Sequence, residues 1–189
     1  DSLATSLPAH RCGQSDVRNE MARVCRGDRA MERLLPVFDR TGVDTRYFVR
    51  PLEWYSEGQP FETRNAVYAT SALELSEKAA RACLDRSGTS PDTIDHIYFV
   101  TTTGLMTPSL DARLASRLGL RPDVRRLPLF GLGCAAGAGA LVRAADTLRA
   151  YPTHRALVIS VELCSLVFSP VARTATDLIG AALFGDGAA

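Results

Sequence analysis

Cys134 is the residue whose type and setting best suit covalent chemistry. It lies in the segment Gly131-Leu132-Gly133-Cys134-Ala135-Ala136-Gly137, between a predicted strand and a predicted helix. A thiol at the start of a helix lies near unpaired N–H groups and the positive end of the helix dipole, which favour the thiolate. The small neighbours leave room for a ligand, and the same N–H groups could hold an oxyanion during acyl transfer. The local pattern gives equal weight to a small apolar cysteine packed between helix and sheet.

The same glycines permit a second interpretation. Gly131, Gly133 and Gly137 loosely fit a dinucleotide-binding fingerprint, and Glu162 ends the following predicted strand, where an acid that binds a ribose would lie. The spacing carries an extra residue and the segment lies deep in the chain, so this pattern is weak by itself.

A run of hydroxyl side chains follows another predicted strand. Thr101-Thr102-Thr103-Gly104 comes at the carboxyl end of residues 94–100, where open α/β sheets place their ligand crevices. The hydroxyls could bind a carbonyl-rich substrate. A threonine-rich turn that satisfies its own backbone is the simpler interpretation, and the turn alone favours it.

No convincing general base accompanies the cysteine. His10, His96 and His154 are the only imidazoles, and none has a spacing that pairs it with Cys134. The histidines and cysteines also lack the spacing of metal ligands, so no metal site is expected.

The elements that must position these residues alternate along the chain. Apolar runs predict strands at 94–100, 124–130 and 156–161. Helical patterns predict helices at 65–86, 137–150 and 176–183, and a short one near 31–38 that Pro36 disturbs. Strands that are apolar along their length and alternate with helices predict an α/β fold, with a mostly parallel sheet covered by helices on both faces.

Finer expectations concern three segments. Residues 51–60 are predicted to form a loop. A short helix should begin with Thr107 as its cap and Pro108 in its first turn, and it should end at Gly119. In the helix that follows Cys134, the residues expected to face the core are Ala138, Leu141, Val142, Ala145 and Leu148.

The composition is that of an ordinary globular protein. Of 189 residues, 22 are basic and 21 acidic, so no global field attracts nucleic acid or a membrane surface, and neither is expected as a partner. No apolar run reaches the ~20 residues that span a bilayer, and no signal peptide opens the chain. Five cysteines, an odd number, in a chain of this size predict reduced thiols in an intracellular, cytoplasmic protein.

The ends suggest a piece of a longer protein. The sequence has no initiator Met, and it stops in Phe184-Gly185-Asp186-Gly187-Ala188-Ala189, a glycine turn that should lead into a further strand.

Taken together, these segments resemble the amino-terminal half of the type III polyketide synthases, the chalcone and stilbene synthase family on the thiolase fold. The resemblance runs from about Phe38 to the end. Four segments in register carry it: residues 133–138, 101–104, 160–162 and 178–189. Ketoacyl-carrier-protein synthases share the turn around Cys134 but fit residues 104–109 and the Phe184 segment less well. The sequences of residues 104–109 and 130–137 most resemble those of bacterial alkylpyrone and alkylresorcinol synthases.

The resemblance implies a role for each residue that matches the family pattern. Cys134 would take the acyl group from a CoA thioester, and Phe184 would be the gatekeeper between the CoA tunnel and the cavity. Arg33 and Arg40 match basic residues that meet the CoA phosphates. Pro36 stands where a third basic residue is usual, which puts that contact in doubt.

Other matching positions bear on the substrate. Thr102 and Thr103 would line the cavity, as would Cys164 and Val167, which stand where plant chalcone synthases have two threonines. Thr107 replaces a Met that reaches into the neighbouring subunit's cavity. Such less polar or smaller linings suit a fatty acyl starter.

For the whole chain, the resemblance implies one N-terminal thiolase-like domain over residues 1–189, with the C-terminal half absent. That half would supply the family's His and Asn, so the chain is expected to be inactive by itself. Uncovered sheet edges and apolar faces should make it marginally stable or sticky.

The implied enzyme is a homodimeric acyltransferase that needs no cofactor beyond its CoA thioester substrates. It would extend a fatty acyl-CoA starter with malonyl-CoA by decarboxylative Claisen condensation, giving pyrone- or resorcinol-type products. The alternatives are a condensing enzyme like ketoacyl-carrier-protein synthase III and a non-catalytic thiolase-fold subunit.

Overall fold

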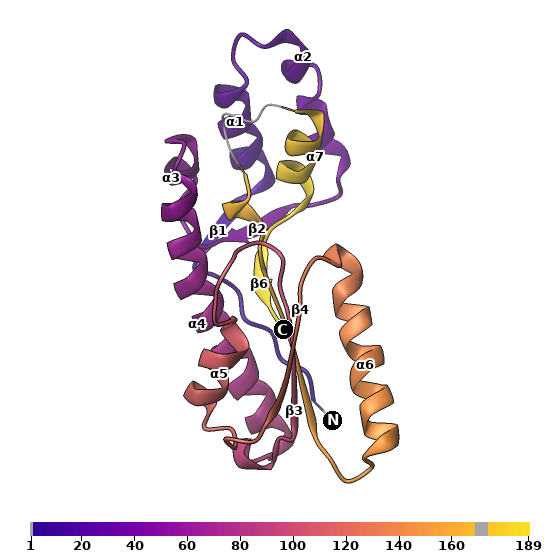
Figure 1. Ribbon diagram of the computed structural model, residues 1–189. Coiled ribbons are helices and arrows are strands. Elements are labelled where there is room, and N and C mark those ends of the chain that lie inside the picture. Colours follow the sequence, from indigo (N-terminus) through magenta and orange to yellow (C-terminus); the bar gives the residue numbers. More distant parts are fainter. Residues whose placement is uncertain (1, 169–173) are drawn as a thin grey trace. The chain divides into compact units, whose positions relative to one another are not determined.

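The chain divides into two compact units in a computed structural model that describes residues 2–168 and 174–189 (Figure 1). The sheet unit comprises Asp1–Ser6, Ala69–Glu162 and Gly187–Ala189. The helical unit comprises Leu7–Tyr68 and Leu163–Asp186. Each unit carries part of the predicted site.

A four-stranded sheet confirms the predicted parallel pairing. Its strand order is β4-β3-β5-β6, where β3 is His96–Val100, β4 Arg125–Leu129, β5 Ala156–Leu163 and β6 Asp186–Ala188. β3 is parallel to both β4 and β5, and Val100 lies opposite Leu129 and Ser160. Ser160 and Ala189 exchange two backbone hydrogen bonds, as residues in antiparallel strands do. The sheet is therefore mixed at the β6 edge.

Helices pack on both sides of β3. α4 (Phe61–Ser87) and α5 (Leu110–Leu118) are drawn on one side of β3 in Figure 1, and α6 (Ala136–Ala150) on the other. Side chains alternate between the faces of a strand, and Tyr98 and Val100 pack against α6. α4 confirms the helix predicted at 65–86 and begins four residues earlier.

The inward face of α6 differs from the prediction. Its buried residues are Ala136, Ala140 and Ala144, whereas Leu141 and Val142 are 62% and 58% exposed. The alanines bring the helix close to the sheet because they carry no bulk beyond Cβ. The larger side chains therefore point away, and a pattern based on hydrophobicity alone selects the wrong stripe.

β4 is also more exposed than a sheet covered on both faces would allow. Residues 125–128 of this edge strand are exposed, whereas all five residues of β3 are buried. β5 alternates between buried and half-buried residues. Full cover is thus confined to the strand between β4 and β5.

The start of α5 lies later than predicted. Ser109, with extended backbone at φ −60° and ψ 156°, takes the cap position, so Thr107 and Pro108 precede the helix. Gly119 ends α5 as predicted, in the left-handed conformation (φ 73°) that glycine adopts without a steric cost.

The helical unit contains several elements that the sequence did not reveal. β1 (His10–Gly13) pairs antiparallel with β2 (Thr45–Phe48), α1 is Gln14–Val24, and α3 (Leu52–Ser56) lies in the predicted loop. The helix expected near 31–38 is two pieces, α2 (Arg29–Glu32) and the 3₁₀ helix η1 (Leu35–Arg40). Pro36 lies in the first turn of η1, where its missing N–H costs nothing.

The rest of the helical unit comes from late in the chain. The 3₁₀ helix η4 is Cys164–Leu166, and α7 is Ala175–Leu183, which confirms the helix predicted at 176–183. Thr174 and Asp177 form a capping box at the start of α7, since each side chain binds the other residue's backbone N–H.

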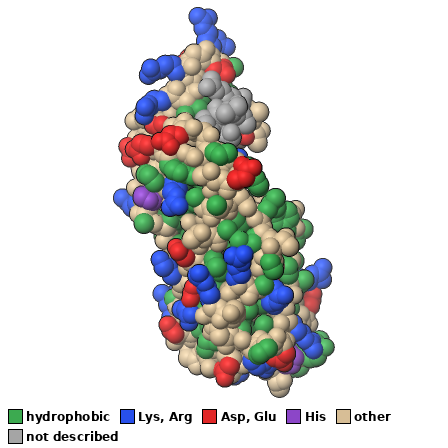
Figure 2. Space-filling view, turned by 60° about the vertical axis from the view of Figure 1, so that its left-hand side comes forward, with side chains coloured by type: hydrophobic (Ala, Val, Ile, Leu, Met, Phe, Trp, Pro, Cys, Tyr) green, Lys and Arg blue, Asp and Glu red, His purple; other side chains and the backbone are tan. Residues whose placement is uncertain are grey.

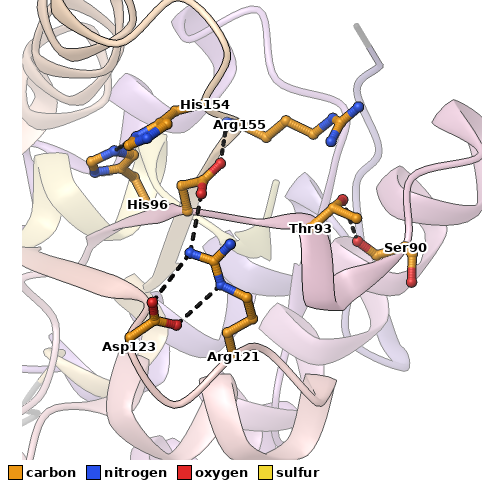
Figure 3. Close-up of polar contacts among 8 residues, drawn as sticks. Ser90, Thr93, His96, Arg121, Asp123, His154 and Arg155 are labelled. Atoms are coloured by element: carbon orange, nitrogen blue, oxygen red, sulfur yellow. Dashed lines mark hydrogen bonds and ion pairs between the residues drawn. The ribbon is translucent and has the colours of Figure 1, made fainter.

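A polar cluster fixes the amino end of β3 (Figure 3). Asp95 accepts a hydrogen bond from the Arg155 backbone N–H at 2.7 Å, and it forms an ion pair with Arg121 at 3.1 Å. The Arg155 N–H is the main cause that lowers the pKa of Asp95. His96 Nε2 lies 2.9 Å from His154 Nδ1. These contacts tie β3 to the segment that begins β5.

The surface in Figure 2 carries interspersed basic and acidic side chains. Among the described residues, no helix is both long and apolar enough to cross a membrane.

Candidate active site

Parallel pairing brings three of the chemistry-bearing segments to one edge of the sheet. Val100 ends β3 opposite Leu129, which ends β4, and the Thr101 backbone N–H donates to the Leu129 carbonyl at 3.3 Å. Thr102 therefore lies at the carboxyl end of β3. The turn that carries Cys134 lies at the carboxyl end of β4, which is the same end of the sheet. Glu162 lies near the carboxyl end of β5, at the same edge. This is the edge at which α/β sheets bind ligands.

Cys134 lies in a 3₁₀ turn, η3 (Gly133–Ala135), that runs directly into α6. Gly131 (φ 84°) and Gly133 (φ 53°) both have left-handed backbone, which a side chain would strain. Cys134 is exposed, which contradicts the alternative of a cysteine packed between helix and sheet.

The start of η3, which runs on into α6, leaves backbone donors beside the thiol. Among the residues that the structure describes, no side chain caps either η3 or α6. The first N–H groups of a helix have no partner within the helix, and together they carry a partial positive charge. The turn can therefore stabilise a thiolate or an oxyanion near Cys134.

Glu162 holds the threonine turn. Its Oε2 accepts hydrogen bonds from the backbone N–H groups of Thr102 (3.0 Å) and Thr103 (3.1 Å), and its Oε1 accepts one from the Thr102 hydroxyl at 2.8 Å. Both carboxylate oxygens are thus bonded within the protein, which removes the feature that favoured a ribose-binding acid. The turn is thus bound to both neighbouring strands, to β5 through Glu162 and to β4 through the Leu129 carbonyl oxygen.

Thr107, the remaining predicted site residue of the sheet unit, is exposed in the segment between the threonine turn and α5. The other predicted site residues lie in the helical unit.

Three of these are substrate-lining candidates at the ends of short elements. Cys164 begins η4 and is half-buried, and Val167 follows η4 and is 58% exposed. Phe184 ends α7, adopts extended backbone (φ −94°, ψ 151°) and is 49% exposed.

The two predicted CoA-binding arginines lie at helix ends in the helical unit. Arg33 follows α2, Arg40 ends η1, and both are exposed. No ion pair joins either side chain to a carboxylate within the described part of the chain.

A buried carboxylate that the sequence did not single out holds the segment with Cys164. Asp186 Oδ1 accepts from the Ser165 backbone N–H at 2.8 Å, and Oδ2 accepts from the Ser165 hydroxyl and from the Val49 N–H at 2.9 Å. The Tyr55 hydroxyl lies 2.7 Å from Ser165 Oγ. Burial raises the pKa of Asp186 to about 6 and also raises the pKa of Tyr55. Ser165 beside Cys164, and the Gly-Asp-Gly sequence, were the available signals.

No three His, Cys, Asp or Glu residues of the described ranges are grouped so that they could hold a metal ion.

Known proteins are similar to this chain in both sequence and fold. A 1,3,6,8-tetrahydroxynaphthalene synthase of Streptomyces peucetius is 44% identical over 191 residues, which cover 100% of this chain and 50% of that protein. A Mycobacterium tuberculosis protein named for α-pyrone synthesis is 30% identical, over 100% of this chain and 49% of its own length. The crystal structure of the Streptomyces coelicolor tetrahydroxynaphthalene synthase matches with a TM-score of 0.94 and 34% identity, over 100% of this chain and 55% of that one.

The chain spans about half the length of the curated relatives it matches. The family model for the N-terminal domain of chalcone and stilbene synthases matches residues 2–189. The mixed sheet, the exposed cysteine turn and this match agree, and the chain belongs to the chalcone and stilbene synthase family.

Proposed function

We propose that the protein is a type III polyketide synthase that uses Cys134 as its nucleophile. The observation that carries the proposal is the exposed thiol in a glycine turn with left-handed backbone, directly before α6. The thiolate attacks the carbonyl carbon of an acyl-CoA, and the CoA thiolate leaves. Malonyl-CoA then loses CO₂, and the resulting carbanion attacks the acyl carbon on Cys134. The new C–C bond forms as the Cys134 thiolate is released, so the product is a β-ketoacyl-CoA.

Backbone donors and other residues of the chain fit this chemistry. Backbone N–H groups at the start of α6 stabilise the oxyanion of each tetrahedral intermediate. Glu162 accepts hydrogen bonds from the backbone N–H groups of Thr102 and Thr103. In this proposal both threonines line the substrate cavity. Arg33 and Arg40 bind the CoA phosphates through exposed guanidinium groups. A homodimer, with Thr107 at the shared cavity and no cofactor beyond the CoA thioesters, completes the proposal for a cytoplasmic enzyme.

For the substrate, we propose a fatty acyl-CoA starter and pyrone- or resorcinol-type products. Support comes from Cys164 and Val167, which are less polar than threonine, and from the mycobacterial relative named for α-pyrone synthesis. An alkyl chain gains about 0.8 kcal/mol for each CH₂ that leaves water, so an apolar lining favours a long starter.

A second candidate product class is tetrahydroxynaphthalene. The observation that favours it is the 44% identity to the Streptomyces peucetius enzyme of that name. The two candidates differ in a measurable way, because a tetrahydroxynaphthalene carries no alkyl chain.

The test supplies the full-length protein with labelled malonyl-CoA, with and without lauroyl-CoA or palmitoyl-CoA, and identifies the products by mass spectrometry. Labelled products that carry the alkyl chain support the first candidate, and an aromatic product from malonyl-CoA alone supports the second. Cys134→Ala should abolish both, whereas Cys83→Ser, a matched control in α4, should not.

Three results would contradict the proposal or its details. Turnover that continues in Cys134→Ala overturns the nucleophile. Condensation that occurs only with malonyl-acyl-carrier protein favours a ketoacyl-carrier-protein synthase. Acyl-CoA binding without any product favours a non-catalytic subunit.

A further inference from the structure

The carboxyl end of α7 is bound by two side chains to which the proposed function gives no role. Arg46 Nη1 donates to the carbonyl oxygens of Ala181 and Phe184, the latter at 3.0 Å. Gln14 Nε2 donates to the carbonyl oxygen of Ala182 at 3.0 Å. The last carbonyls of a helix lack partners within the helix, and here two side chains supply them.

Arg46 is itself held by contacts beyond these carbonyls. Its Nη2 donates to Gln14 Oε1 at 2.6 Å. Its guanidinium carbon lies 5.5 Å from the ring centre of Phe48 and 6.0 Å from that of Phe38, within the range of cation–π contact. The aliphatic stem lies against the turn after α7, since a Cβ at Gly185 would be 3.5 Å from Arg46 Cβ. Contacts therefore hold both the terminal nitrogens and the aliphatic stem of Arg46.

The positive charge of Arg46 is buried at the carboxyl end of α7. Arg46 is only 5% exposed, and within the described ranges no ion pair joins it to a carboxylate. Burial lowers its pKa to about 10, so the guanidinium remains protonated at neutral pH. A buried cation needs compensation, and here it comes from the charge of Asp186 and from the carbonyls at the end of α7, which carry the negative end of the helix dipole.

We propose that Arg46, oriented by Gln14, is a positioning residue for Phe184 and thereby helps to determine which acyl chains the enzyme accepts. This inference rests on the proposed function, in which Phe184 gates the path from CoA to the cavity. The Phe184 ring is half exposed, so its direction depends on the backbone that Arg46 binds.

Gln14 extends the connection to a second candidate binding residue. Its Nε2 also donates to the Phe38 carbonyl oxygen at 3.2 Å and to Thr41 Oγ1 at 3.0 Å. These acceptors flank Arg40, the candidate contact for CoA phosphate at the end of η1. One amide thus joins the segment that would bind CoA to the helix end that carries the gate.

The experiment compares Arg46→Lys and Gln14→Met with Arg23→Lys in the full-length protein. Arg23 is an exposed arginine of α1, so its replacement controls for the loss of a guanidinium. The readout is the ratio of kcat/KM for palmitoyl-CoA over hexanoyl-CoA. We expect Arg46→Lys to change this ratio by about threefold or more, in the same direction as Phe184→Leu. The double variant Arg46→Lys/Phe184→Leu should show no change in this ratio beyond that of Phe184→Leu, because Arg46 acts through the Phe184 ring.

Hydrogen exchange at the Phe184 amide provides a readout that does not depend on activity. This N–H donates to the Gly180 carbonyl oxygen at 2.9 Å, and we expect it to exchange faster in Arg46→Lys and Gln14→Met than in Arg23→Lys. An unchanged exchange rate overturns the inference, as does a starter ratio that stays at the wild-type value while the melting temperature falls. A wild-type protein that makes no polyketide from any starter overturns the proposed function alone, since the exchange result still tests the positioning.

Discussion

At the scale of single residues, the turn around Cys134 depends on backbone conformation more than on side-chain contacts. Gly133 has φ 53°, and nothing lies within 4 Å of a Cβ built on it, so the only cost of Gly133→Ala is conformational strain. That strain is about 1–2 kcal/mol for a residue with a side chain. We expect Gly133→Ala to lower the melting temperature and to displace the thiol, which would slow its alkylation by iodoacetamide.

Gly137→Ala is the matched control. It also has open space around a Cβ, but it lies in the first turn of α6, where alanine is more favourable than glycine by up to about 1 kcal/mol. We expect this variant to raise the melting temperature and to leave the alkylation rate of Cys134 near that of the wild type. Equal effects of the two substitutions would show that the left-handed turn does not hold the thiol in place.

The buried carboxylate of Asp186 makes the helical unit sensitive to pH. Its pKa of about 6 lies above the ordinary 3.8, so the folded protein binds this proton more tightly than the unfolded chain. The resulting contribution to the free energy of unfolding is fully present below about pH 4 and is lost as the pH rises through about 6. Asn cannot titrate, so the stability of the wild type relative to Asp186→Asn should fall by a few kcal/mol across this window.

Urea unfolding of both proteins between pH 4 and pH 8 measures this difference. Asp186→Asn should also be the less stable protein at pH 7, because its amide N–H₂ would face the N–H of either Ser165 or Val49. A constant difference across the pH range would mean that Asp186 does not titrate there.

The sequence identified the thiol because a cysteine between a strand and a helix is a local pattern. The bond from Glu162 to Thr102 joins residues 60 positions apart, and that from Asp186 to Val49 joins residues 137 apart. No local pattern contains such a pairing. The pairing of Glu162 depends on the register of parallel strands, which places a residue of β5 beside the turn after β3.

At the scale of elements, long periodic segments were predicted well, and short elements were not. α4 follows its predicted range because 27 residues supply many turns of one pattern. In α1 only Val17 and Met21 are buried, and most other residues are polar. Two apolar positions are too few for the helical pattern to be recognised in the sequence. The stripe on α6 was misassigned because the sheet selects the smallest side chains there. Packing against a sheet thus overrides ranking by hydrophobicity.

His96, at the amino end of β3, should make the stability of the fold depend on pH. Burial is the main cause that lowers the pKa of His96, with further lowering from His154 and Arg125 and an opposing effect of Asp95. The folded protein therefore binds this proton less tightly than the unfolded chain. The stability contribution is present above the ordinary value of 6.5 and is lost as the pH falls below it.

We expect His96→Gln to flatten the fall in melting temperature between pH 7 and pH 5. His10→Gln replaces an exposed histidine and serves as the control. Calorimetry at half-unit pH steps measures both slopes. Equal slopes in the two variants would mean that acid sensitivity does not arise at the start of β3.

At the scale of the whole molecule, the chain spans about half of its relatives and exposes an apolar face on α6. Leu141 and Val142 are exposed on this helix, and Phe130 and Leu132 are exposed in the turn before it. Large apolar side chains exposed at neighbouring positions of one helix commonly mark a surface that a partner covers. The alanine face of α6 packs on the sheet, so the leucine and valine face is available for further protein.

This arrangement predicts opposite effects of one substitution in two contexts. In the isolated 189-residue chain, Leu141→Ser removes exposed apolar surface, so it should reduce binding of a hydrophobic dye and reduce aggregation in light scattering. In the full-length protein, the same change would place a hydroxyl in a covered apolar contact and should lower the stability by about 2–5 kcal/mol. Arg143→Ser, at an exposed polar position of the same helix, should have little effect in either context. If Leu141→Ser leaves the melting temperature of the full-length protein unchanged, the face of α6 stays in water, and the remainder of the protein packs elsewhere.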